Sequence, residues 1–266
     1  MKCRAACLPV VVIASSVVLA AQGQEFARVL RNGAQATLSV YGPRPVDLAA
    51  KKLVDEFGVA INVEDPVYIY RDDVQDVGVA RSGRRFLIAK ASLLEMRFEW
   101  PAVGSVLDVR EVVRDLVGTA NAQLPFAYRI DNDGEVFTLV ATRTRDAQGR
   151  SVELTPILDR HVTIPLGTRT VFEHANLLTQ ALEKQTGVRI SCCQAGVGGI
   201  PWGSTVVSFE ARDEPARSGL LRLVRSEQGN PNHVAGIEPT RYQWLMRCEP
   251  AQPWCFINVA PIRKKP

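Results

Sequence analysis

The apolar positions of the chain fall into two series of elements that resemble each other. The first series opens with a helix whose apolar face consists of Val46, Ala50, Leu53 and Phe57. Gly58 follows directly, and glycine commonly ends a helix because it accepts a left-handed backbone. The alternating stretch VAINVED, residues 59–65, then predicts a strand.

Three further elements complete the first series. The stretch LLEMRFEW, residues 93–100, alternates as a strand does. A continuous apolar stripe predicts a helix over 107–118, and Asp108 with Glu111 forms a capping-box pattern at its start. Residues 126–142 predict a hairpin around an Asn-Asp-Gly turn.

The second series repeats this order. Thr170 and Glu173 form another capping box, and Gly187 ends the helix that they begin. The remaining predicted elements are strands at 188–192 and 205–211, a helix that begins at Asp213-Glu214-Pro215, and a hairpin of strands at 241–248 and 255–262.

Identical residues recur at an offset of 129 positions, as in Leu53 with Leu182 and Ile61 with Ile190. The second helices match at an offset of 107, so the first series holds 22 additional residues, which we assign to residues 63–105. The pattern predicts an α+β fold of two related β-α-β-β-α-β-β units, each with its helices packed on a mixed sheet. We place the units at 24–150 and 151–266; one fused domain is the alternative.

The first 23 residues have the layout of a secretory signal peptide. Lys2 and Arg4 precede an apolar run from Leu8 to Ala21, and Ala21 and Gly23 are the small residues that follow. The run is shorter than the roughly 20 residues of a membrane span, although a retained anchor is an alternative. No later stretch is apolar enough to span, so we expect an exported protein of the periplasm or the extracellular space.

Charge gives no reason to expect a nucleic-acid partner. Removal of residues 1–23 leaves 30 basic and 28 acidic residues, a net charge of +2. Nucleic-acid binding usually needs a strongly basic surface. The basic end at Arg263, Lys264 and Lys265 is typical of a solvated terminus.

The cysteines also suggest export. Four remain after the signal segment: Cys192, Cys193, Cys248 and Cys255. Four cysteines in an exported chain fit two disulfides, with three possible pairings. Cys248 and Cys255 could bridge the last hairpin, or either could reach the adjacent pair. A bond between Cys192 and Cys193 would be strained and could act as a redox switch.

Two small-residue segments carry candidate chemistry. The stretch Gly196 to Gly203 has the glycine spacing of a phosphate loop, but Ser204 stands where that loop requires lysine. We therefore expect a flexible loop that carries Trp202, either as a binding anchor or as a cap on the core. The segment DNDGE, residues 131–135, fits a hairpin turn better than a calcium loop, which needs further ligands.

The remaining polar candidates suggest no metal or catalytic site. The three histidines, His161, His174 and His233, lack zinc-site spacings, and we expect His174 on the surface. Asp72, Asp73 and Asp76 are expected in a solvated loop, with calcium binding as the alternative. No serine lies in a nucleophile-elbow motif. We therefore expect no catalytic residues, no metal and no cofactor.

The helix–glycine–strand phrase resembles the short N-terminal domain shared by secretins and TonB-dependent receptors. The matching pieces are AAKKLVDEFGVAINV with LDVREVVRDLVG, and NLLTQALEKQTGVRIS with PARSGLLRLVRS, about a quarter of the chain. The resemblance implies a small α+β interaction module of the bacterial envelope. This chain differs in its long insert, and neither a pore region nor a receptor barrel follows.

These patterns predict an exported, non-enzymatic envelope protein that binds a protein or peptide partner. An exposed sheet edge or a helix face would supply the contact. Two alternatives remain: a hydrolase or metal-dependent enzyme with a site assembled from scattered residues, and a redox-responsive element that uses Cys192 and Cys193.

Overall fold

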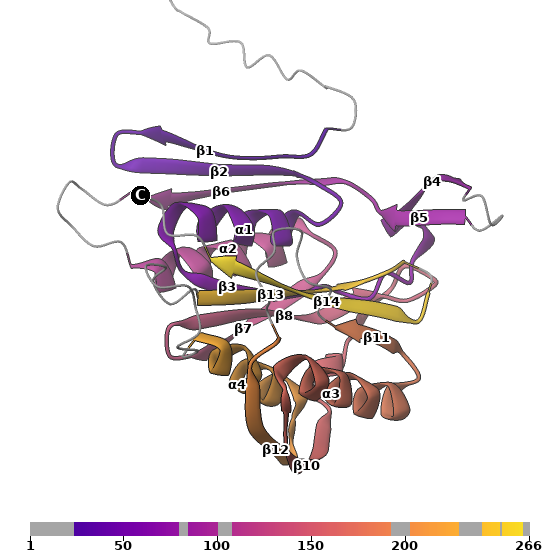
Figure 1. The fold of residues 1–266 in the computed structure, drawn as a ribbon. Helices are drawn as coiled ribbons and strands as arrows, with labels where there is room; N and C mark the ends of the chain where they lie inside the picture. The colour runs from indigo at the N-terminus through magenta and orange to yellow at the C-terminus, as the bar shows by residue number, and fades with distance from the viewer. Residues whose placement is uncertain are drawn as a thin grey trace, which may run out of the picture.

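The computed structural model describes residues 24–79, 85–100, 108–192, 203–228, 241–250 and 252–262. Trp202, Cys193, His233 and the predicted signal segment lie outside these residues. The described chain is α+β, with helices packed on mixed sheets. Five layers follow one another in Figure 1: a sheet, two helices, a central sheet, two helices and a two-stranded sheet.

The outermost sheet of the first half contains three antiparallel strands. They are β1 (Phe26–Asn32), β2 (Gln35–Gly42) and β6 (Ser92–Glu99), with β2 in the middle. Two helices, α1 (Pro45–Phe57) and α2 (Val109–Gln123), pack between this sheet and the central one. Val46, Ala50 and Leu53 of the predicted face of α1 are buried, whereas Phe57 is partly buried against the same core.

The central sheet runs through both halves of the chain. Its strand order is β11 (Arg189–Cys192), β14 (Trp254–Ile262), β13 (Arg241–Cys248), β3 (Ala60–Glu64), β8 (Val136–Arg145) and β7 (Ala127–Asp133), and β9 (Ser151–Glu153) pairs with β8. Its other face is covered by α3 (Val171–Thr186) and α4 (Ala216–Gln228). Beyond these helices lie β10 (His161–Thr170) and β12 (Val206–Pro215). None of the helices in the described residues is long and apolar enough to cross a bilayer.

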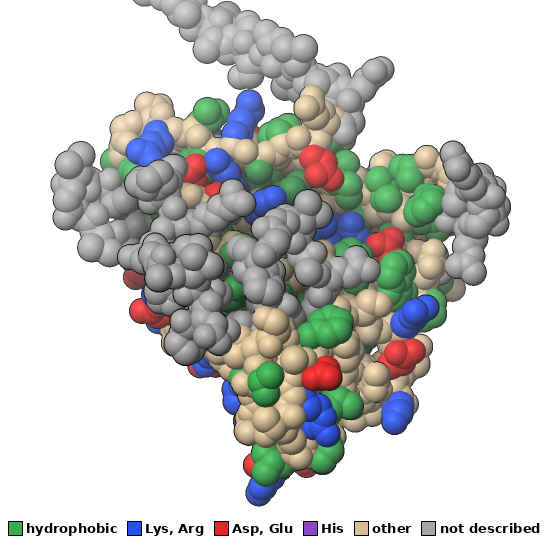
Figure 2. Space-filling model, in the orientation of Figure 1, with side chains coloured by type: hydrophobic (Ala, Val, Ile, Leu, Met, Phe, Trp, Pro, Cys, Tyr) green, Lys and Arg blue, Asp and Glu red, His purple; other side chains and the backbone are tan. Residues whose placement is uncertain are grey.

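An arm of two antiparallel strands, β4 (Val74–Val79) and β5 (Arg85–Ala89), projects from the first half. It follows a short 3-10 helix, η1 (Arg71–Asp73). Hydrophobic side chains gather on this arm (Figure 2), where Phe86 is more than half exposed. The arm lies in the stretch 63–105, where the additional residues of the first series were predicted.

The predicted starts of α2 and α3 and the predicted ends of α1 and α3 are confirmed, whereas α2 continues to Gln123, beyond its predicted end at residue 118. The Asp108 carboxylate accepts hydrogen bonds from two backbone N–H groups of the first turn of α2. Thr170 and Glu173 form the complete capping box of α3. Gly58 and Gly187 end α1 and α3 with φ of 64° and 69°, the left-handed values that glycine adopts without strain.

The predicted start of the last helix is wrong. Residues 213–215 belong to β12, and α4 begins at Ala216. A turn-rich triplet commonly caps a helix, but here Pro215 pairs with His161 of β10, so the strand continues to the first helical residue. A second short 3-10 helix, η2 (Ile157–Asp159), precedes β10.

The strand pairings of the two halves follow the same pattern. In the first half β8 is parallel to β3 and antiparallel to β7, while β2 is antiparallel to β6. In the second half β14 is parallel to β11 and antiparallel to β13, while β10 is antiparallel to β12. The halves differ beside β2, where β1 adds a third strand. The boundary near residue 150 stays a prediction, because one sheet continues across it.

Two hydrophobic cores lie on opposite faces of the central sheet. On β13, Leu245 packs into the core of the first half, whereas Trp244 and Met246 pack into that of the second. On β3, Ile61 and Val63 belong to the first core. Because successive side chains of a strand point to opposite faces of the sheet, one sheet contributes side chains to both cores.

The two halves join where β13 lies parallel to β3. The backbone register is short, with Leu245 opposite Val63 and Met246 opposite Glu64. A side chain extends this backbone pairing, since the Asn62 amide oxygen accepts a hydrogen bond from the backbone N–H of Trp244 at 2.9 Å. The two halves are therefore held by polar contacts as well as by the ladder.

The strongest of these contacts is an ion pair inside the joint. Glu64 of β3 is buried, and the guanidinium of Arg217 at the start of α4 contacts both of its oxygens, at 2.5 and 3.0 Å. A buried carboxylate without a partner is strongly unfavourable, so this arginine holds α4 against the sheet of the first half.

We expect Arg217→Met to lower the free energy of unfolding by about 3–5 kcal/mol, because the substitution leaves the Glu64 carboxylate buried and unpaired. Urea unfolding of the purified protein measures this change. The matched control is Arg222→Met, also on α4, whose ion pair with Glu214 is half-exposed and should contribute less than about 1 kcal/mol. An equal loss in the two variants would contradict the assignment.

Candidate functional site

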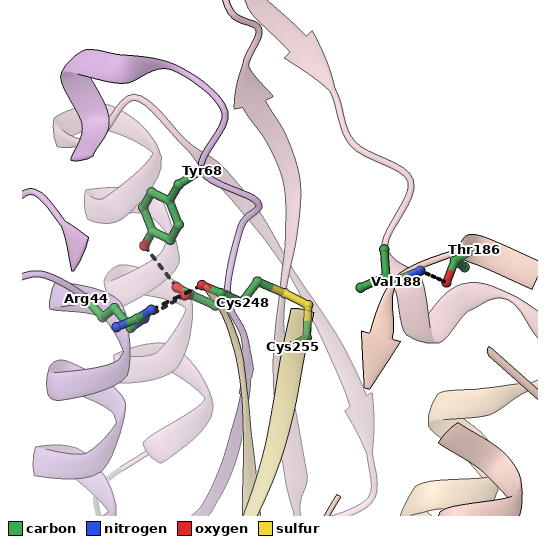
Figure 3. The surroundings of a disulfide bond; sticks show 7 residues. Arg44, Tyr68, Thr186, Val188, Cys248 and Cys255 are labelled. Atoms are coloured by element: carbon green, nitrogen blue, oxygen red, sulfur yellow. Dashed lines mark hydrogen bonds and ion pairs between the residues drawn. A yellow bond between two sulfur atoms is a disulfide. The ribbon is translucent and has the colours of Figure 1, made fainter. Parts of the chain in front are cut away.

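Cys248 and Cys255 form a disulfide between β13 and β14, as one of the predicted pairings had it. The two residues lie opposite each other in the strand register and are buried. Arg44, at the start of α1, donates to the Cys248 carbonyl at 3.2 Å (Figure 3). The bond therefore fixes the end of the last hairpin next to the joint.

The other predicted cysteine site is only partly described. Cys192 ends β11, is buried and is disulfide-bonded. Cys193 and the proposed anchor Trp202 lie outside the described residues. The sequence therefore remains the basis for both of those predictions.

His174 is not on the surface, so that prediction is wrong. It is completely buried in α3, with Nε2 3.2 Å from the Val207 carbonyl oxygen and its ring beside Phe209. The polar neighbours of His174 in sequence suggested exposure. The two-stranded sheet that covers α3 buries it instead, and this packing is not local in the sequence.

The acidic residues of η1 and β4, Asp72, Asp73 and Asp76, do not form a shared solvated cluster. Asp73 is buried and pairs with Arg145 of β8, while Asp72 is exposed and accepts from the Tyr70 hydroxyl at 2.8 Å. Asp76 accepts from the Gly78 N–H, a local turn contact. Among the residues that the structure describes, no group of three or more His, Cys, Asp or Glu side chains is arranged to hold a metal ion.

Polar side chains from distant segments do converge in one place, around Arg217. Besides Glu64, its guanidinium contacts Asp131 of β7 at 2.8 Å and also Asp159 of η2. Arg129 pairs with the same two aspartates, at 2.9 Å each. Three carboxylates of this group thus share two guanidiniums, and the ion pairs join β3, β7, η2 and α4.

Asp65, the residue after β3, has the most unusual environment of the joint. Its carboxylate accepts from Arg44 at 2.7 Å and from the Tyr68 hydroxyl at 3.0 Å. Burial nevertheless raises the pKa of Asp65 to about 6, because the cost of desolvating the charge exceeds the gain from these partners. Burial likewise raises the pKa of Glu64. The adjacent cavity is only ≈ 20 Å³, about the size of one water molecule, so it fits no substrate.

A much larger depression lies on the second half, between β10 and α3. This groove has a volume of ≈ 550 Å³. One wall is the start of β10, from His161 to Pro165, and the other is a single face of α3, with Leu177 and Ala181 at its base. Gln180, Lys184 and Gln185 supply polar lining from α3, and His161, Thr163 and Asp213 supply it from β10 and β12. A concave surface that combines apolar and polar side chains is a candidate binding site.

The groove follows an unpaired edge of a sheet. β10 pairs with β12 on one side, and among the described residues no strand pairs with its other side. Two features limit this edge: Gln185 donates to the His161 carbonyl at 2.8 Å, and Pro165 has no N–H to offer. Such features protect an edge strand from indiscriminate pairing while leaving room for a selected one.

In the first half, a third strand lies beside β2. β1 pairs with residues Gln35 to Tyr41 of β2 and packs against α1. Ala27 and Val29 of β1 pack against the core, and a side chain at Gly42 of β2 would collide with Leu48 of α1. Leu48 has Leu177 as its counterpart at the offset of 129.

One residue at the groove holds a strained backbone. Asp213 has φ of 49°, in the left-handed region, at a register shift between β10 and β12. The shift directs its carboxylate to 3.3 Å from Nδ1 of His161. Strain kept at a lining residue is frequently associated with function. The sequence signal for it was the Asp213-Glu214-Pro215 triplet, which favoured a helix cap instead.

No protein-family model, curated protein or solved structure matches the chain. The role of the groove therefore has to be argued from its own geometry and chemistry.

We expect the contribution of Asp65 to stability to depend on pH. Its pKa is raised from 3.8, the value expected for the unfolded chain, to about 6 in the folded protein. The folded protein therefore binds the proton more tightly, and this contribution to stability is present at low pH and is lost as the pH rises through about 6. The loss is about 3 kcal/mol. Asp65→Asn should flatten the pH dependence of the free energy of unfolding between these two pKa values, as measured with urea. Asp55→Asn, on the exposed face of α1, should leave that pH dependence unchanged. The same slope in Asp65→Asn and the wild type would contradict this.

We expect Asp213→Gly to raise the free energy of unfolding by about 1 kcal/mol, because glycine adopts a positive φ without strain. The lost pair with His161 is exposed and offsets little of this gain. The urea midpoint measures the change. Asp115→Gly, on α2, is the matched control: there glycine should destabilise by about 1 kcal/mol. Destabilisation at both positions would show that Asp213 is not strained.

Proposed function

We propose that this chain is an exported, non-enzymatic protein of the cell envelope that binds a protein or peptide partner. The partner inserts an extended segment into the groove between β10 and α3, where it adds a strand to the β10–β12 sheet. The observation that carries the proposal is the unpaired edge of β10 above a groove of ≈ 550 Å³. Strand addition is a common mode of peptide recognition.

The first half supports this mode of binding from within the same chain. Its β1 lies beside β2 and over α1, and small apolar side chains of β1 contact the core. The matching pairings of β3, β7 and β8 with β11, β13 and β14 support the proposal that the halves are two related units. The groove would then be the second unit's version of a place that the first unit fills with its own chain.

Two sequence features and one structural feature support export. Residues 1–23 have the composition of a signal peptide, and four cysteines lie beyond them. The Cys248–Cys255 disulfide is typical of a protein from an oxidising compartment. The resemblance of both halves to the short N-terminal domain of secretins and TonB-dependent receptors agrees with an envelope interaction module.

Selection of extended peptides on the intact, disulfide-bonded protein tests the proposal. We expect enriched peptides to slow amide exchange in β10 and to lose binding at least about tenfold in Ala181→Arg, since a bulky side chain at the base of the groove blocks the added strand. Glu183→Arg is the matched control, because it adds the same side chain to an exposed position of α3 outside the groove lining.

Two results would count against the proposal. One is the recovery of no specific peptide from the selection. The other is the recovery of peptides whose binding survives Ala181→Arg and whose exchange protection lies away from β10, because the partner would then bind at another surface.

A further inference from the structure

The outer face of the β1–β2–β6 sheet is a second exposed surface, at the end of the molecule opposite the groove (Figure 1). Both α1 and α2 lie on one face of this sheet, so its other face is turned to solvent. An antiparallel sheet normally carries polar side chains on such a face. Three large apolar side chains are nevertheless exposed here: Phe26, Leu30 and Leu93 are 38%, 56% and 50% exposed.

The strand register gathers two of these side chains into one apolar row. Phe26 pairs with Tyr41, and Tyr41 pairs with Leu93, so the three side chains cross the sheet side by side. The rings of Phe26 and Tyr41 stack with their centroids 6.1 Å apart. Apolar side chains that are exposed together mark an interaction surface, whereas single ones do not.

The adjacent row carries opposite charges at its two ends. Arg28 of β1 pairs with Ser39 of β2, and Ser39 pairs with Glu95 of β6. The Arg28 guanidinium lies 5.1 Å from the centre of the Phe26 ring, and the Ser39 hydroxyl donates to the Glu95 carboxylate at 2.7 Å. In this row the face is therefore positive at β1 and negative at β6, with about 10 Å between the two strands.

The middle strand carries no charge on this face. Its outward side chains are those of Gln35, Thr37, Ser39 and Tyr41. The charged side chains stand on the two flanking strands. An interface between proteins usually has this composition, with few charges at its centre and a polar rim.

A second copy of the same face complements both rows. Two sheets pack face to face with their strands within about 30° of each other. A two-fold axis that runs between the sheets, along β2, places β1 of one copy over β6 of the other and keeps each row opposite itself. Phe26 then meets Leu93 of the second copy. Arg28 meets Glu95 of the second copy, and symmetry repeats both contacts.

We propose that the chain forms a symmetric dimer through the outer face of the β1–β2–β6 sheet. In this dimer Leu30 lies on the stem of Arg97 of the second copy, whose methylene groups cover the leucine. The groove stays free, because β10 and α3 lie at the opposite end of the molecule (Figure 1). The inference therefore does not depend on the proposed function.

Sedimentation velocity of the intact, disulfide-bonded protein between about 1 and 200 µM measures the self-association. We expect a dissociation constant on the order of 10 µM, because a face of three short strands is smaller than the roughly 800 Å² per partner of a standard interface. Arg28→Glu and Glu95→Arg should each weaken the dimer at least about tenfold, since symmetry places two like-charged contacts in it. Glu183→Arg is the matched control: it makes the same change at an exposed position of α3 and should leave the dimer unchanged.

Mixing the two variants tests the direction of the axis. The Arg28→Glu chain is acidic at both positions, and the Glu95→Arg chain is basic at both. The mixture should therefore form a mixed dimer about as strong as that of the wild type, although each variant associates only weakly with itself. A chain with both substitutions should recover the wild-type dimer, because each charge again meets its opposite.

Three results would overturn the inference. One is a monomer over the whole concentration range. Another is a dimer that tolerates both charge reversals, because the contact would then lie on another surface. The third is a mixture no stronger than the separate variants, because β1 would then not lie over β6 of the second copy. Peptide binding in the groove stands or falls separately from all three.

Discussion

The fold depends on the burial of β3 from both sides. All five residues of this strand are buried, and its two faces look into different halves of the chain. The apolar face, with Ile61 and Val63, needs only the helices of the first half. The polar face, with Asn62 and Glu64, needs Trp244 and Arg217 of the second half, because a buried amide or carboxylate without a partner is costly. The polar face therefore determines how the second half docks.

This arrangement also explains why the groove is open on one side. The central sheet fixes α3 and α4 through contacts with β11 and β13. β10 and β12 then cover these helices from outside, but two strands cover less of a helix pair than the three strands of the first half do. The uncovered part is the face of α3 that Leu177 and Ala181 provide. In the part of the chain that the structure describes, apolar side chains of α3 thus lie beside an unpaired strand edge.

The features that the sequence predicted correctly are local ones. A capping box at Thr170, the left-handed glycines 58 and 187 and the hairpin disulfide each depend on residues within a few positions of one another. The missed features depend on distant contacts. His174 is buried by a strand more than thirty residues away, Asp73 forms an ion pair with Arg145, and the groove is formed by β10 and α3, whose packing is not local in the sequence. Periodicity describes which face of an element is apolar, but it does not state which element covers that face.

The shared strand has a consequence for how the chain could have been assembled and how it comes apart. Most tandem domains could fold separately, because each has its own core and meets its neighbour through an interface like that of a transient complex. Here the two halves meet within one sheet, where β13 pairs with β3. Removal of the second half would expose Asn62 and Glu64 of β3, which are buried in the intact protein. Unfolding of one half would expose this buried polar face, so the stability of each half depends on the presence of the other.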